Sequence, residues 1–267
     1  MKKLIIAGLA LAAFVSFAGT CNVINVRITS FASHKTLGGE LQNTSGADLL
    51  QHNIRVTFFD SNNNIVETKV TTGCLRSLQD GASDFFSVQT SGDGSTVVSA
   101  ISALAYDGAL RSGTTVPGNA SISNVQIHRN GTSLVVTGTL TNNDDTTLAS
   151  PVVCVVVRDD SDHILVVGKD TTADLAQNVS DSFSVTLPVP SDSAIVNKVD
   201  FWFDGLEGGV PIAPEQSVGH LVSVCAATAT ATATNTGTAT ATNTASATDT
   251  PAATTTVVPT ATTNPCS

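Results

Sequence analysis

Basic side chains are scarce in this sequence. Only 12 of the 267 residues are Lys or Arg, against 22 Asp or Glu, which gives a formal net charge of −10 and a pI near 4.7. Nucleic-acid binding needs clustered Lys and Arg to neutralise phosphates, and the sequence offers no such cluster. Charged residues make up 13% of the chain and aromatics 4%, too few charges for a coiled coil or a solvated helical bundle. The composition therefore argues against nucleic-acid binding and favours β-structure.

Catalytic motifs are also missing. The five histidines fall in separate segments, and no nucleophile elbow of the Gly-x-Ser-x-Gly type occurs. The polar run 60–64 resembles the start of a calcium loop, but Ile65 stands where such a loop needs glycine, so a plain hairpin turn is expected. The acidic run 159–162 could bind a hard cation in a geometry that differs from a calcium loop. A solvated acidic turn without a cation is the preferred interpretation. We expect a protein that is not an enzyme and that uses no metal or cofactor.

Residues 1–20 are typical of a secretory signal peptide. Two lysines precede an uncharged apolar run that is shorter than the ~20 residues of a membrane span, and small residues follow it. Cleavage after Ala18 fits simple secretion. Alternatively, the Ala-Gly-Thr-Cys stretch ending at Cys21 resembles a bacterial lipobox, in which Cys21 carries a lipid anchor. No later segment is long and apolar enough to span a bilayer, so we expect an exported protein that is extracellular or associated with the cell surface or envelope.

An internal repeat sets the predicted architecture. The motif Asn-Val-Arg-Ile at 25–28 recurs as Asn-Val-Gln-Ile at 124–127, about 99 residues further on, and other motifs recur at nearly the same spacing. In each copy, short segments of alternating apolar and polar residues are separated by turn-forming residues. This pattern predicts the short strands of an all-β sandwich. We expect two tandem immunoglobulin-like β-sandwiches, over residues 21–113 and 114–209, followed by a disordered Thr/Ala-rich tail.

Alternation within one strand of each copy predicts the two cores. The apolar side chains of the first strand share one face, and the residues between them, such as Arg55, face outward. The predicted core residues are Ile54, Val56 and Phe58 in the first copy and Val153, Val155 and Val157 in the second.

The strands resemble a known family. The Gly-x-Leu-x-Asn strand end, the segment Val-Thr-Phe-Phe-Asp at 56–60 and the later Phe-x-Val strand at 86–88 are similar to the FxLYD domain, an immunoglobulin-like module of exported bacterial proteins. The second copy keeps the Asp at 159 but lacks the aromatic pair. The resemblance implies a fold and a location outside the cytoplasm, and it implies no catalytic residues.

Two further segments follow the repeat. Residues 210–225 alternate weakly and are expected to be a connecting segment or an extra strand that covers a sandwich edge. Residues 226–267 consist mainly of Thr and Ala, contain no Lys or Arg, and cannot bury enough apolar surface to fold alone. Such low-complexity tails are typical of spacers and glycosylated stalks.

The remaining cysteines suit an oxidising compartment. If Cys21 is lipidated, an even number is left: Cys74, Cys154, Cys225 and Cys266. Four cysteines allow three pairings. Cys154 lies on the outward phase of its strand, from which it can reach either Cys74 across the junction of the copies or Cys225 on the following segment.

Trp202 is the only tryptophan and the single candidate ligand-binding residue. Phe201 and Phe203 are expected to face the core, which turns Trp202 outward. An exposed Trp is suited to stack on a sugar ring or to anchor a partner. Packing against the other sandwich or the segment after it is the alternative, and it is the preferred one.

These observations favour a non-catalytic, exported structural or adhesive protein of the bacterial cell envelope or surface. Its partner is an envelope or extracellular molecule, for which a glycan is one candidate. A glycan- or protein-binding module is the second hypothesis and a secreted enzyme the third.

Overall fold

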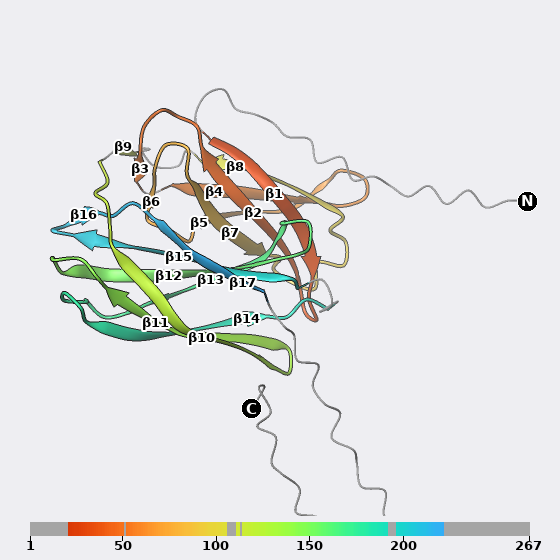
Figure 1. The fold of residues 1–267 in the computed structure, drawn as a ribbon. Coiled ribbons are helices and arrows are strands. Elements are labelled where there is room, and N and C mark those ends of the chain that lie inside the picture. The colour runs from red at the N-terminus through yellow and green to blue at the C-terminus, as the bar shows by residue number, and fades with distance from the viewer. Residues whose placement is uncertain (1–20, 51, 106–110, 113, 192–195, 222–267) are drawn as a thin grey trace, which may run out of the picture. The chain divides into compact units, whose positions relative to one another are not determined.

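The computed structural model describes residues 21–50, 52–105, 111–112, 114–191 and 196–221. These residues form strands and no helix, so the protein is all-β (Figure 1). The chain divides into two units, residues 1–224 and 225–267, and the described residues all belong to the first. The predicted signal peptide (1–20), the predicted tail (226–267), Cys225 and Cys266 lie outside the described residues.

The first copy forms two main antiparallel sheets that enclose a core. Their strand orders are β1-β2-β7 and β5-β4-β8, and a small sheet, β6-β3-β9, accompanies them. The strands are β1 (Cys21–Ser30), β2 (Lys35–Asn43), β3 (Leu49–Leu50), β4 (Asn53–Phe59), β5 (Ile65–Thr72), β6 (Ser77–Leu78), β7 (Ser83–Gln89), β8 (Ser99–Ala105) and β9 (Arg111–Ser112). Ile54, Val56 and Phe58 of β4 are fully buried against side chains of β2 and β7, which confirms the predicted alternation.

The second copy repeats this arrangement. Its sheets are β10-β11-β14 and a larger sheet in which β12 lies between β13 and β15, while β16 and β17 pair with the far side of β15. The strands are β10 (Ala120–Asn130), β11 (Ser133–Asn142), β12 (Leu148–Arg158), β13 (Ile164–Thr171), β14 (Ser180–Pro188), β15 (Lys198–Glu207), β16 (Val210–Pro211) and β17 (Glu215–Leu221). Val153, Val155 and Val157 are buried in a core of their own, as predicted.

The two copies share irregular details as well as strand order. The pairing of β1 with β2 shifts register between Ile24 and Arg27, and the pairing of β10 with β11 shifts at the corresponding place. Asn25 and Asn124 lie at these irregularities with φ of 53° and 52°. Asparagine tolerates this left-handed conformation better than most residues, so the repeated Asn-Val motif marks a repeated bulge.

Buried asparagines close equivalent turns in the two copies. Asn43 Nδ2 donates to the carbonyl oxygens of Ala47 and Leu78, and Asn142 Nδ2 donates to those of Thr146 and Leu175. Both side chains are almost completely buried. These hydrogen bonds satisfy the buried amides, so the Asn of the Gly-x-Leu-x-Asn strand end has the same structural role in each copy.

A third apolar layer joins the two sandwiches. The outer face of the β13-β12-β15 sheet packs on the outer face of the β1-β2-β7 sheet, and Figure 1 shows the first copy stacked above the second. A Cβ added at Gly38 of β2 would lie 2.2 Å from the carbonyl oxygen of Ile164, so glycine permits this close approach. The layer contains Cys74, Leu75, Phe85, Cys154, Val156, Ile164 and Trp202.

The segment that links the two copies pairs with the segment that follows β15. Val116 forms a parallel bridge with Ile212, and its N–H donates to the Pro211 carbonyl oxygen at 3.0 Å. Further along, β17 runs antiparallel to β15 and covers an edge that would otherwise have unpaired backbone groups.

Candidate functional site

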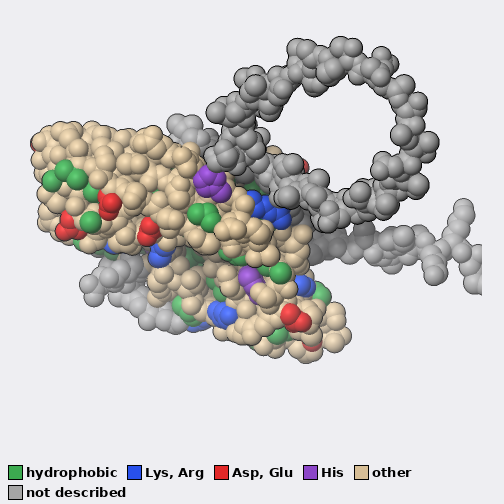
Figure 2. Space-filling view, turned by 90° about the horizontal axis from the view of Figure 1, so that it is seen from below, with side chains coloured by type: hydrophobic (Ala, Val, Ile, Leu, Met, Phe, Trp, Pro, Cys, Tyr) green, Lys and Arg blue, Asp and Glu red, His purple; other side chains and the backbone are tan. Residues whose placement is uncertain are grey.

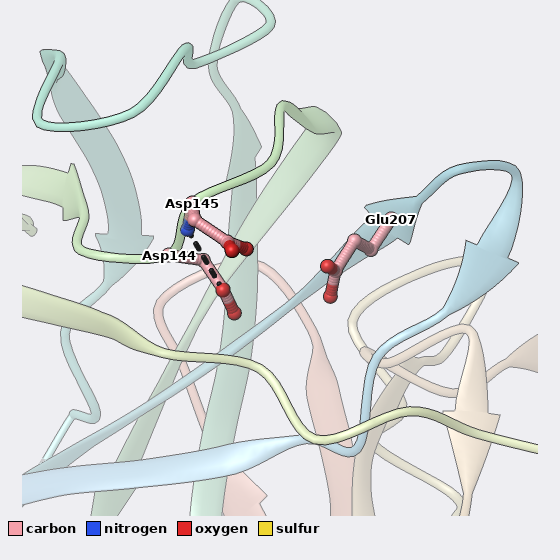
Figure 3. A group of neighbouring side chains, drawn as sticks. All are labelled: Asp144, Asp145 and Glu207. Carbon is pink, nitrogen blue, oxygen red and sulfur yellow. Dashed lines mark hydrogen bonds between the residues drawn. The ribbon is translucent and has the colours of Figure 1, made fainter.

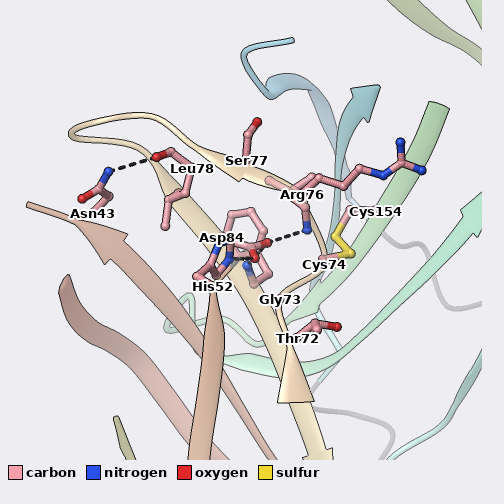
Figure 4. A network of polar contacts seen from close by, with 12 residues as sticks. Asn43, His52, Thr72, Gly73, Cys74, Arg76, Ser77, Leu78, Asp84 and Cys154 are labelled. Atoms are coloured by element: carbon pink, nitrogen blue, oxygen red, sulfur yellow. Dashed lines mark hydrogen bonds and ion pairs between the residues drawn. A yellow bond between two sulfur atoms is a disulfide. The ribbon is translucent and has the colours of Figure 1, made fainter. Parts of the chain in front are cut away.

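A disulfide joins the two sandwiches across their shared face. Cys74, in the loop after β5, is bonded to Cys154 on β12, with Cα atoms 5.9 Å apart (Figure 4). Both residues are buried. Of the pairings that the sequence left open, the structure has the one across the junction, and Cys225 and Cys266 lie outside the described residues.

A buried His–Asp pair holds the loop that carries Cys74. The ring of His52 contacts the carboxylate of Asp84, whose Oδ1 accepts the N–H groups of Leu75 at 2.9 Å and Phe85 at 2.7 Å (Figure 4). His52 is 3% exposed and Asp84 is fully buried, so substrate has no access to this pair. The pair therefore positions the disulfide loop.

Asp204 of β15 fixes the next part of the same loop. Its Oδ2 accepts the N–H groups of Arg76 and Ser77, and its Oδ1 accepts that of Gly205. Burial raises the pKa of Asp204 to about 6, although these backbone hydrogen bonds oppose the increase. A carboxyl of the second copy thus caps a loop of the first.

Trp202 lies inside the interface and is not an exposed ligand platform. The alternation prediction was correct, since Phe201 and Phe203 face the core and Trp202 faces the other way. However, the first sandwich covers that face, and Trp202 is only 9% exposed. Its ring centroid lies 4.0 Å from that of Phe85, so the expected exposure was wrong and the preferred alternative, packing against the other sandwich, was correct.

Arg158 connects the aromatic pair to three acidic residues. Its guanidinium carbon lies 5.4 Å from the Phe85 ring centroid and 5.9 Å from that of Trp202, within the range of cation–π attraction. Its Nε donates to Asp200 Oδ2 at 2.9 Å, and its NH1 donates to the Asp162 carbonyl oxygen at 2.9 Å. Glu40 Oε2 of the first copy lies 3.5 Å away. A buried guanidinium is stable only with such partners, and removing one costs about 3–5 kcal/mol.

A cavity of about 450 Å³ opens beside Arg158, between the sandwiches. Asn25, Glu40 and Ser83 line it from the first copy, and the acidic and basic residues of the Arg158 cluster line it from the second. Lys198 Nζ lies 3.1 Å from Asp200 Oδ1, yet that buried oxygen accepts no well-directed hydrogen bond. Trp202, Phe85, Pro214 and Gln216 complete the wall.

The cavity lining combines charged, polar and aromatic side chains. Among the described residues that line it, Ser83 carries a hydroxyl, and Glu40, Asp162, Asp200 and Lys198 carry ionisable groups. The volume falls within the usual range of small-molecule sites, and the lining mixes donors, acceptors and aromatic carbon. Sequence reasoning identified Trp202 and missed Arg158, Asp200 and Glu40.

The acidic turns use their carboxylates internally. Asp60 Oδ1 accepts the N–H groups of Asn62 and Asn64, and Asp159 Oδ1 accepts those of Ser161 and His163. Burial tends to raise the pKa of Asp159, but the hydrogen bonds from His163 and Arg27 outweigh it and hold the pKa below its ordinary value. Asp60 and Asp159 therefore each close their own turn through backbone hydrogen bonds.

A different acidic group, which the sequence did not suggest, lies at the start of the turn after β11. Carboxylate oxygens of Asp144, Asp145 and Glu207 lie within 4.8 Å of one another (Figure 3). Thr146 donates a hydrogen bond to Glu207, and the Asp145 N–H donates to Asp144 Oδ1 at 2.9 Å. The group is partly exposed and has the chemistry of a weak site for a hard cation.

Cys21 begins β1 and pairs with Asn43. Its thiol is half-buried, and burial raises its pKa to about 11 despite a backbone hydrogen bond from Thr44. This environment disfavours the thiolate, so the free thiol is a poor nucleophile.

The outer face of the β10-β11-β14 sheet bears mainly hydroxyls. Thr137 and Thr139 of β11 stand opposite Ser184 and Ser182 of β14, and the β14 side chains are exposed. Figure 2 shows the molecule of Figure 1 from below. Most atoms on this side belong to uncharged polar side chains or to the backbone, and charged side chains are scattered among them. Such a face offers hydrogen bonds and little charge to a partner.

Comparisons with known proteins give no family. No family model matches the chain, and no curated protein matches it. Solved structures with partial similarity are red sea bream transglutaminase (10% identity, TM-score 0.22), a glycosyl hydrolase family 2 member from Bacteroides cellulosilyticus DSM 14838 (11%, 0.27) and a protein designated pT26-6p (7%, 0.22). The matches cover 73%, 69% and 76% of this chain, but only 31%, 28% and 65% of those chains. TM-scores this low assign no function. Among the described residues, no helix has the length and apolar character needed to cross a membrane.

Proposed function

We propose that this protein is a non-catalytic structural or adhesive protein, exported to the bacterial cell envelope or surface, whose two sandwiches act as one rigid body. The resemblance of both copies to FxLYD-type immunoglobulin-like domains agrees with such a role. The observation that carries the proposal is the buried Cys74–Cys154 disulfide across the junction, because disulfides persist mainly in oxidising compartments.

Three further contacts support the rigid-body part of the proposal. Arg27 of the first copy forms an ion pair with Asp159 of the second, Ser77 Oγ donates to the Ile212 carbonyl oxygen at 3.0 Å, and Asp204 caps the disulfide loop. Independent contacts that lie on different strands resist hinge motion between the sandwiches. A rigid spacer of this kind is suited to display a binding face at a distance from its anchor.

Fractionation of the source cells tests the proposal. An antibody against the described region should detect the protein outside the cytoplasm, with Cys74 and Cys154 unreactive to a thiol-alkylating reagent until a reductant is added. A protein that is found in the cytoplasm with both thiols reduced would contradict export. The intact mass of the same material distinguishes simple secretion from lipid attachment at Cys21, since an acylated terminus adds the mass of its chains.

Ligand binding is the second candidate function, and the cavity beside Trp202 favours it. A secreted enzyme is the third candidate. An activity screen would support it only if substitution of one Ser, His or Asp abolished turnover without unfolding the protein.

A further inference from the structure

One edge of the first sandwich carries most of the exposed apolar side chains. The large apolar side chains that are exposed in the described part of the chain are Ile65, Val66, Val70, Val98 and Val179. The first three belong to β5, and Val98 donates its N–H to the carbonyl oxygen of Phe59, the residue that pairs with Ile65. The exposed apolar surface is therefore concentrated along β5 and at the adjoining end of β4.

The backbone of β5 is as open as its side chains. Among the described strands, β5 pairs with β4 alone. In an antiparallel edge strand, every second residue directs its N–H and C=O away from the sheet. β5 contains neither proline nor glycine, and its register with β4 shifts only next to Ile65. A strand added at this edge would therefore find regularly spaced bonding groups from Glu67 to Thr72.

The equivalent strand of the second copy lies in an interface. Ile164 of β13 corresponds to Ile65 at the 99-residue spacing, and it is fully buried in the layer between the sandwiches. Ile65 is 66% exposed. The same strand position is thus covered by a neighbouring sandwich in the second copy and bare in the first.

The order of charges along β5 selects a partner for this edge. Charges on an edge strand oppose pairing unless the register places opposite signs together. If two copies of β5 pair antiparallel about a twofold axis at Thr68, Glu67 of each copy lies opposite Lys69 of the other, and Val66 lies opposite Val70. An axis at Glu67 or at Lys69 would place like charges opposite each other. The strand is therefore complementary to itself in this central register.

Contacts within the first sandwich leave both charged side chains able to bind a partner. The N–H of Ser91 donates to Glu67 Oε1 at 2.9 Å, and Lys69 donates to the carbonyl oxygen of Gln89. Lys69 Nζ lies 3.7 Å from Glu67 Oε2, which is longer than a hydrogen bond. The side chains of Lys69 and Glu67 are 31% and 19% exposed. Since an ammonium group has three donors, Lys69 can still bond a carboxylate of a partner.

We propose that β5 is an interface for a second copy of this chain, and that two copies pair their β5 strands antiparallel about a twofold axis at Thr68. The pairing joins the two β5-β4-β8 sheets into one continuous sheet and is isologous, so it closes at the dimer. A single strand pair buries less surface than the interface of an obligate dimer, so the association is reversible. The proposal does not depend on where the protein is located.

Sedimentation equilibrium of the full-length oxidised protein tests the dimer. Between about 1 μM and about 1 mM, we expect a monomer–dimer equilibrium. Glu67→Lys and Lys69→Glu each place like charges opposite each other, so each variant should self-associate at least about tenfold more weakly. A mixture of these two variants restores opposite charges at both positions and should associate as tightly as the unmodified protein. This rescue also shows that both variants are folded.

A pair of matched variants tests the apolar contact. Val70→Thr keeps a residue that favours strands and removes the contact with Val66 of the other copy, so it should weaken the dimer. Val179→Thr makes the same change at an exposed valine outside β5 and should leave the dissociation constant unchanged.

Three results would overturn the proposal. The protein could remain monomeric at every concentration, or it could associate while neither charge reversal weakens the association and the mixed variants show no rescue. Growth into oligomers larger than a dimer would indicate a contact that does not close, which contradicts the twofold axis. None of these results bears on export or on the rigidity of the two sandwiches, which fractionation and thiol labelling test separately.

Discussion

Replacement of Asp204 by Asn should abolish a defined pH dependence of stability. Asp204 is fully buried, and its pKa rises from an ordinary value of 3.8 to about 6, chiefly because of burial. At about 1.4 kcal/mol per pKa unit, this difference corresponds to about 3 kcal/mol. Asp204→Asn keeps the shape of the side chain and removes the titration.

The sign of the effect follows from the direction of the pKa change. The folded protein binds the proton on Asp204 more tightly than the unfolded chain does, so protonation favours the folded state. The stabilisation is complete below about pH 4 and disappears as the pH rises through about 6. The free energy of unfolding of the unmodified protein, minus that of the variant, should therefore fall by most of about 3 kcal/mol between pH 4 and pH 7.

Urea unfolding at several pH values between 4 and 7 measures this difference directly. Comparing two proteins cancels the titration of carboxyls such as Asp159, whose lowered pKa acts in the opposite direction. Asp160→Asn removes an exposed carboxylate that directly follows Asp159, and it controls for the loss of one negative charge. A difference for Asp204→Asn that stays constant with pH would refute the burial of this carboxyl between the sandwiches.

Three other substitutions have expected effects on stability. Replacing Cys74 and Cys154 together by Ala should lower the free energy of unfolding by about 4.5 kcal/mol, since the disulfide spans 80 residues, and a loss below about 1 kcal/mol in urea would contradict the link. Gly138→Ala places a Cβ 2.5 Å from a buried phenylalanine ring and should cost about 1–3 kcal/mol, whereas Gly92→Ala, with no atom within 4 Å, should leave the melting temperature unchanged. Trp202→Ala should cost about 3–5 kcal/mol by calorimetry, and a neutral effect would mean that the interface is not packed around this ring.

The cores could be predicted because each depends on local alternation. Val56 and Phe58 lie two residues apart on one face of β4, and the same spacing recurs at Val155 and Val157. The duplication strengthened the prediction, since two copies of one pattern must fold alike. The direction of Trp202 followed from the same reasoning.

Alternation predicts which side chains of β12 and β15 point outward, but it could not predict which surface covers them. The sequence of β12 nevertheless contained a signal, because a nearly continuous apolar run is typical of a strand buried on both faces, whereas β4 alternates with Arg55 and Thr57. That contrast indicates that the sheet of β12 is covered on its outer face, whereas the sheet of β4 is not. It does not indicate which surface covers it.

The cavity depends on residues that are distant in sequence. Arg158 and Glu40 are 118 residues apart and come from different sandwiches. Their contact requires the relative placement of two domains, on which the repeat pattern carries no information. The partial exception is Arg158 itself, a charged residue that directly follows an apolar run and stands where the first copy has Phe59.

Peptide mapping of the native protein without reduction tests the central claim most directly, since face-to-face packing of the two sandwiches brings Cys74 and Cys154 together. The account predicts one cross-linked peptide pair that contains these two cysteines. Pairing of either with Cys225 or Cys266, or recovery of both as free thiols, would contradict the arrangement of the sandwiches and the cavity between them.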